Sequence, residues 1–291
     1  MAEAPQPFVV AGVEVNRDSD EFQSESYSAG AGVHLGDSNP GDRIGYRHSA
    51  LEYSGPAFHA TGSSDSLFAT RKLGAVDVGG ELTQSRLNTG QEKWLGWAQV
   101  SARPSEASNL ELRYEKNWIE SARALEAGVT YAMLSAAGDY QLTQRWNVAG
   151  VLGRLDFSDG NDRPLYRVKT SWVLSEQFGL STYARARSYT DSDPYGGYYF
   201  APELYRDYLA GLGLRRRLAI VRGTMSAQID WGRQVVDGES SQARTWNVRL
   251  ESWAGLRWSY AIAAGYNATA GIGGGGNYEY RYASASFTWL F

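Results

Sequence analysis

One segment of the sequence gathers aromatic and acidic side chains in a way that suits carbohydrate recognition. Between Ser188 and Pro202 it carries tyrosines among glycines and aspartates. Aromatic faces pack on the C–H bonds of sugar rings, and carboxylates accept hydrogen bonds from their hydroxyls. An ordinary aromatic girdle at a membrane interface, with a solvated loop, explains the same residues equally well. The sequence thus predicts a polysaccharide-binding surface made of Asp191, Asp193, Tyr195, Tyr198, Tyr199 and Phe200.

The sequence predicts no catalytic or metal centre. It contains three histidines, His34, His48 and His59, and no cysteine. His48 stands beside Ser49, but neighbouring side chains on a strand point to opposite faces and cannot act as nucleophile and base. No metal-ligand spacing is present, and the glycines of 271–276 are expected at a hairpin tip rather than around a phosphate. We therefore expect no enzyme activity and no cofactor, and the net charge of −4 indicates no nucleic-acid partner.

The elements that must position these residues are strands with one apolar face. At the end of the chain, serine and threonine alternate with the apolar residues Ala283, Ala285, Phe287, Trp289 and Phe291. A last strand that ends on an aromatic residue is typical of bacterial outer-membrane barrels, where it closes the barrel against lipid. It also resembles the signal that the barrel-assembly machinery recognises. We therefore predict an all-β fold, a transmembrane antiparallel up-and-down β-barrel, with a soluble β-sandwich as the alternative.

Composition agrees with this fold. The 291 residues contain no apolar run near the ~20 residues that a membrane helix needs. The mean hydropathy is −0.42, as expected when only every second strand residue faces lipid. The 19 tyrosines and 10 tryptophans suit interfacial girdles, and 33 glycines with only 8 prolines suit strand ladders.

Short turns and longer loops alternate along the chain. Their number predicts about sixteen strands, an even count that leaves both chain ends in the periplasm. The predicted barrel spans residues 7–291 after an N-terminal tail of residues 1–6. Met1–Pro5 does not look like a signal peptide, so we expect that an export signal has been removed. Three segments fit less clearly: 57–66 suits strand or loop, 121–128 has helical propensity, and 148–155 breaks the alternation, which indicates a bulge.

The polar faces of the strands are expected to line a water-filled lumen, because charges are costly in lipid. Acidic residues come early in the chain and basic residues later. This order predicts that acids and bases face each other on opposing walls and create a transverse field, although pairing with neighbours is the plainer alternative. The predicted pore-lining residues are Glu14, Asp77, Glu81, Glu111, Arg113, Glu115, Glu126, Arg167, Lys169, Arg185, Arg187, Arg222, Asp230, Arg249 and Glu251.

The stretch Tyr198-Tyr-Phe-Ala-Pro-Glu203 leads into a late strand of this barrel. In a barrel of this length it resembles the C-terminal porin domain of exopolysaccharide secretion proteins, which export poly-N-acetylglucosamine, Pel polysaccharide or cellulose. The resemblance implies an outer-membrane pore that conducts an exopolysaccharide to the cell exterior. It also implies a preceding periplasmic domain of tetratricopeptide repeats, or a synthase complex, as partner. Phage-adsorption barrels of similar layout share these features.

Two other functions remain open: a general or sugar-selective diffusion porin, and a surface receptor or adhesion barrel. A long loop folded into the lumen would favour the diffusion porin. The nearly balanced lumen charge favours a neutral or weakly charged polysaccharide over a strongly anionic one. Outer-membrane lipid and lipopolysaccharide are the expected surroundings in every case.

Overall fold

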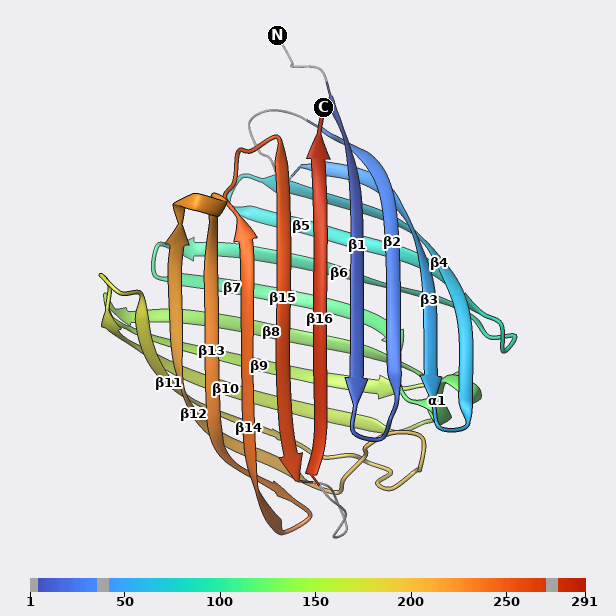
Figure 1. Cartoon of the computed structure of the whole chain (residues 1–291). Helices are drawn as coiled ribbons and strands as arrows, with labels where there is room; N and C mark the ends of the chain where they lie inside the picture. Colours follow the sequence, from blue (N-terminus) through green and yellow to red (C-terminus); the bar gives the residue numbers. More distant parts are fainter. Residues whose placement is uncertain (1–4, 36–41, 271–276) are drawn as a thin grey trace.

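The computed structural model describes residues 5–35, 42–270 and 277–291, and these form one closed antiparallel barrel (Figure 1). Each strand pairs with its neighbour in the sequence, and β1 pairs with β16, which confirms the predicted sixteen-stranded up-and-down barrel. The strands are β1 (Gln6–Asp18), β2 (Gln23–His34), β3 (Arg43–Gly55), β4 (Phe58–Leu73), β5 (Val76–Leu87), β6 (Glu92–Ser105), β7 (Ser108–Trp118), β8 (Thr130–Thr143), β9 (Trp146–Phe157), β10 (Asp162–Ser175), β11 (Leu180–Tyr189), β12 (Tyr205–Leu218), β13 (Gly223–Val236), β14 (Glu239–Ser252), β15 (Trp258–Ala270) and β16 (Asn277–Leu290).

Period-two alternation sets the two faces of the wall. On β7 the apolar Leu110 and Leu112 point outward and are 54% and 53% exposed. Glu111 and Arg113 alternate with them and face the lumen, where both hydrogen-bond to Gln99 of β6. Outward apolar side chains of this kind recur on strands all around the ring, which gives the barrel the apolar outer surface that lipid requires.

Both described ends of the chain lie at one end of the barrel, called the terminal end below, and the other is called the loop end (Figure 1). The loop-end connections are shorter than expected in places. β3 and β4 are joined only by Pro56 and Ala57, so most of the 57–66 segment is strand. β9 pairs with β10 without a register shift, so the bulge expected within 148–155 is absent from these paired residues. The glycine-rich 271–276 segment lies outside the described residues.

The largest departure is a helix in the β7–β8 connection, α1 (Ala122–Ala127). Ser121 caps it, since its Oγ accepts from the Ala124 N–H at 3.3 Å, and Gly128 ends it in the left-handed conformation with φ of 70°. Glu126 is therefore on a helix and not on a strand, so its predicted place in the pore wall is wrong. Leu125 on the same helix is fully buried and does not face lipid.

A single turn of 3₁₀ helix, η1 (Ala219–Val221), connects β12 to β13 at the terminal end. Arg222 follows it with φ of 48° and is exposed in this turn, so it does not lie on a strand of the pore wall as predicted. Within the described residues no helix is long and apolar enough to cross a membrane.

Phe291 lies just beyond β16, where its N–H donates to the carbonyl of Pro7 at 3.0 Å and its side chain is 66% exposed. We predict that Phe291→Ala lowers the yield of folded barrel several-fold, because the ring completes the apolar face of the closing strand. Folded and unfolded forms would be separated by gel electrophoresis of unboiled and boiled samples. Phe178→Ala, at an exposed aromatic residue in a turn of the same end, is the control. Equal yields of folded Phe291→Ala and wild-type protein would contradict this role.

Candidate functional site in the lumen and at the loop end

Most of the predicted pore-lining residues do face the lumen, and their charges are paired with close neighbours. Arg47 of β3 contacts Glu81 of β5 at 2.5 Å, and Arg113 contacts Glu115 on its own strand at 2.9 Å. The later strands repeat the pattern with Arg185–Asp230 at 3.4 Å, Arg187–Asp207 at 2.6 Å and Arg249–Glu251 at 2.5 Å. At these positions the local pairing alternative holds, rather than opposition across the lumen.

The remaining predicted pore-lining residues form no ion pair among the described residues, and several of them contact neutral side chains instead. Glu111 accepts a hydrogen bond from Gln99 at 2.9 Å, and Asn16 donates to Glu14 at 3.4 Å. Asp77 lines a cavity nearer the terminal end with Arg43 and Lys72. Arg167 and Lys169 lie on β10, where the Lys169 ammonium sits 3.9 Å from the centre of the Tyr183 ring. Charge is therefore distributed unevenly over the wall of the lumen.

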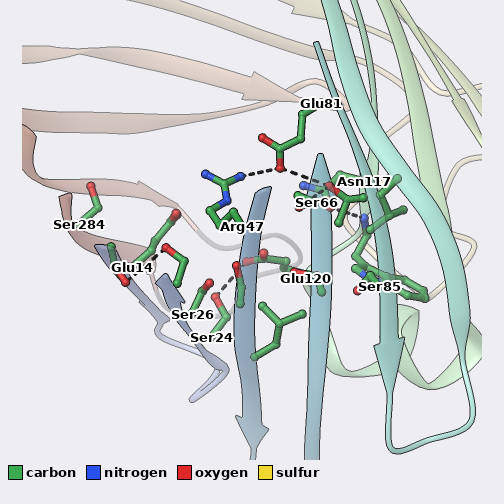
Figure 2. A pocket seen from close by; sticks show the side chains of 18 of the residues that line it. Glu14, Ser24, Ser26, Arg47, Ser66, Glu81, Ser85, Asn117, Glu120 and Ser284 are labelled. Atoms are coloured by element: carbon green, nitrogen blue, oxygen red, sulfur yellow. Dashed lines mark hydrogen bonds and ion pairs between the residues drawn. The ribbon is translucent and has the colours of Figure 1, made fainter. Parts of the chain in front are cut away.

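A cavity of about 590 Å³ lies against the inner faces of β1 to β7 and β14 to β16 (Figure 2). Serine hydroxyls dominate its lining, among them Ser24, Ser26, Ser28, Ser49, Ser64, Ser66, Ser85, Ser284 and Ser286. Carboxylates, arginines and the rings of Tyr53, Trp97 and Trp118 complete it. Hydroxyl donors and acceptors beside aromatic faces suit sugar rings. This surface is not among the predicted site residues, although the alternating serines at 24, 26 and 28 are a sign of it in the sequence.

The β7–β8 connection folds into the loop end of this lumen. Leu125 of α1 packs in an apolar cluster on the inner wall, called the mouth cluster, which consists of Tyr53, Phe58, Ala60, Leu87, Leu95, Trp118 and Leu125. Trp118 Nε1 donates to Ser85 Oγ at 3.0 Å, and Glu120 accepts from Ser24 Oγ at 2.9 Å (Figure 2). The connection is thus held inside the barrel by the burial of Leu125 and by the contact of Glu120 with β2.

The β11–β12 connection, residues 190–204, is also fixed to the inner wall. Asp191 is fully buried at its side chain and accepts from Arg163 Nε at 2.9 Å and Asn161 Nδ2 at 3.0 Å. Burial raises the pKa of Asp191, while its hydrogen bonds to Arg163 and Asn161 act in the opposite direction. Tyr199 stacks on Phe157 with ring centres 4.5 Å apart. Asp191 and Tyr199 are therefore engaged in holding this loop.

The other predicted sugar-binding residues of the loop are accessible. The exposed fractions of Tyr195, Tyr198 and Phe200 are 63%, 41% and 42%. Asp193 is exposed at its side chain, while the Tyr195 hydroxyl already donates to Asp237 at 2.8 Å. Tyr198, Phe200 and Asp193 are the members of the predicted surface that remain free for a ligand to contact.

The two inward loops meet each other. Ser121 Oγ donates to the Tyr198 carbonyl at 2.5 Å, and Arg123 Nη1 donates to the Gly197 carbonyl at 3.2 Å. These two hydrogen bonds, called the loop junction below, join the β7–β8 side of the ring to the β11–β12 side. Nothing in the alternating pattern indicated Arg123 as a contact residue, because the junction depends on how two irregular loops fold.

Comparisons with known proteins agree on the fold. No family model matches the chain, and no curated protein matches it. Among solved structures, one described as a bacterial polysaccharide outer membrane secretin superposes with a TM-score of 0.76 at 12% identity, with 98% of each chain covered. A structure of OccD1 (OprD) gives 0.52 at 9% identity, covering all of this chain and 96% of the other. OprD from Pseudomonas aeruginosa gives 0.51 at 8% identity, covering all of this chain and 97% of the other. These likenesses agree with the closed, sixteen-stranded up-and-down β-barrel seen here.

We predict that Arg123→Ala speeds hydrogen exchange in residues 190–204, because it removes half of the loop junction and leaves the anchors of each loop in place. One net hydrogen bond contributes about 0.5–1.5 kcal/mol, so exchange of amides protected by that contact should rise roughly two- to tenfold. Exchange would be followed by mass spectrometry in detergent. Arg145→Ala, in an exposed turn at the terminal end, should leave the loop unchanged. Unaltered exchange in Arg123→Ala would mean that the junction does not restrain the loop.

Proposed function

We infer that the barrel is an outer-membrane pore that conducts an exopolysaccharide from the periplasm to the cell exterior, with the loop end outside. The observation that carries this proposal is the hydroxyl-rich wall of the lumen, where serines, carboxylates and aromatic rings face water together. Many weak polar sites let a polymer bind without stalling, whereas a few strong sites would trap it. The match to the polysaccharide secretin over nearly the full length of both chains supports the same choice.

The loop end supports the proposal in a second way. Tyr198 and Phe200 present exposed rings beside the lumen, and the loop that carries them is fixed by Asp191 and Tyr199. A preorganised aromatic surface at the exit would guide a sugar chain with little loss of entropy on binding. The preceding repeat domain or synthase complex, lipopolysaccharide and the barrel-assembly machinery remain predicted partners.

A diffusion porin is the second candidate. The α1 connection is a loop folded into the lumen, and such a loop favours a diffusion porin. The structural likeness to OprD adds weight to it, at a lower TM-score. The two candidates differ in what should bind the lumen: a porin passes short solutes, and an exporter engages several consecutive sugars.

We predict that oligosaccharides block the ion current of this barrel in planar bilayers, and that block becomes tighter as the oligosaccharide lengthens. Tyr198→Ala with Phe200→Ala should raise the blocking concentration about thirtyfold, since each ring contributes on the order of 1 kcal/mol and the double variant removes both. The backbone bonds of both residues to Ser121 and Arg163 do not involve these side chains.

Tyr166→Ala, on the outward face of β10 and 56% exposed, removes a ring that cannot meet the solute. It should leave the block at the wild-type level. Block that does not depend on oligosaccharide length would favour the diffusion porin, and the absence of any ion current would contradict both candidates.

A further inference from the structure

Like charges lie directly opposite each other on β10 and β11. In the register of this strand pair, Arg167 is opposite Arg187, and Lys169 is opposite Arg185. Opposed side chains of an antiparallel pair have Cβ atoms roughly 5 Å apart, and like charges at that spacing destabilise the pair. Both pairs face the lumen, so four cations form a compact array on its wall, called the basic quartet. Nearby anions would reduce the repulsion among these four cations.

The protein supplies anions for only half of the quartet. Arg187 contacts Asp207 at 2.6 Å and Arg185 contacts Asp230 at 3.4 Å, and both aspartates are buried at 2% and 3% exposure. These acids lie on β12 and β13, on one side of the quartet. Each aspartate forms its ion pair with a β11 arginine, and together the two acids balance only two of the four positive charges.

No acid approaches the quartet from the other side. In the register of β9 and β10, Val151 is opposite Arg167 and Ala149 is opposite Lys169. Among the residues that the structure describes, neither Arg167 nor Lys169 has a carboxylate within 4.0 Å. Arg167 is exposed to the lumen, and Lys169 lies over the Tyr183 ring. Four bases with two acids leave two positive charges without a counter-charge in the protein.

We propose that Arg167 and Lys169 bind the carboxylate groups of an acidic saccharide inside the lumen. The guanidinium of Arg167 can bind a carboxylate through two parallel hydrogen bonds. The ammonium of Lys169, two residues further along the same face of β10, adds a second positive charge. Val151 and Ala149 offer an apolar strip on which the C–H face of the same sugar ring can lie. This site revises the expectation of a neutral polysaccharide, because the bases of the basic quartet outnumber the acids that pair with them.

The inference rests on the proposed function for its ligand class, and binding measured without conduction separates the two. Fluorescently labelled trigalacturonate would be titrated into the full chain in detergent, with binding followed by anisotropy. The double variant Arg167→Gln, Lys169→Gln should weaken binding at least tenfold and reduce its dependence on salt. Unlabelled maltotriose, which is neutral, should compete at least tenfold less well than unlabelled trigalacturonate.

The matched control removes two positive charges from the outer face of β12 and β13, through Arg206→Gln with Arg233→Gln. These residues lie among the exposed Tyr208 and Trp231, so wild-type affinity is expected. Heat-modifiable migration would show that every variant is folded.

Wild-type affinity in the quartet variant would overturn the site, as would equal competition by maltotriose. Competition by inorganic phosphate as effective as that by trigalacturonate would overturn the assignment to a saccharide and leave a general anion site. Loss of ion current and oligosaccharide block, with trigalacturonate binding intact, would overturn the proposed pore and not the site.

Discussion

The whole structure depends on the requirement that every backbone N–H and C=O in the wall finds a partner inside the protein. Lipid offers none, so a sheet in a membrane must close on itself. Here β1 and β16 close it, with register partners from Phe8 and Leu290 at the terminal end to Asp18 and Tyr280 at the loop end. Closure fixes the register, and the register fixes which face each side chain takes. A slip of one residue would turn lumen charges into the bilayer, so the charge pattern and the fold specify each other.

Distance explains why lumen charges pair locally. Neighbours on adjacent strands lie roughly 5 Å apart, whereas opposing walls of a water-filled barrel are separated by more than the Debye length of about 8–10 Å. Arg187 therefore pairs with Asp207 beside it, and the acidic residues of the early strands have little influence on it. An array such as the basic quartet creates its field only near its own wall. Its influence on cargo must be exerted on groups that touch that wall.

The sequence was sufficient where backbone periodicity alone decides the outcome. The outward Leu110 and Leu112 and the inward Glu111 and Arg113 follow from the period of two, and the strand number follows from the alternation of short turns with longer loops. It was insufficient at Leu125, where alternation continued in the sequence but Ser121 and Gly128 supplied caps for a helix. The packing of that helix against Tyr53 and Trp118 depends on residues distant in the chain, which no local pattern reveals. Contacts between distant residues also decide which predicted sugar-binding residues are accessible. Asp191 forms a buried ion pair with Arg163, whereas Tyr198 is exposed.

The strengths of the contacts indicate where the loop end would open. Leu125 is fully buried in the mouth cluster, and removing a buried leucine of that kind typically costs about 2–5 kcal/mol. The β11–β12 loop is held by a buried ion pair and a ring stack, so releasing it would leave Arg163 and Asp191 without their partners. The loop junction consists of two hydrogen bonds to backbone carbonyls, together worth about 1–3 kcal/mol net. Separation at the junction is therefore the least costly movement, because each loop keeps its own anchors on the wall. Under the proposed export function, a polymer that arrives from the lumen would offset that cost through contacts with Tyr198 and Phe200, which lie on the loop that it would displace.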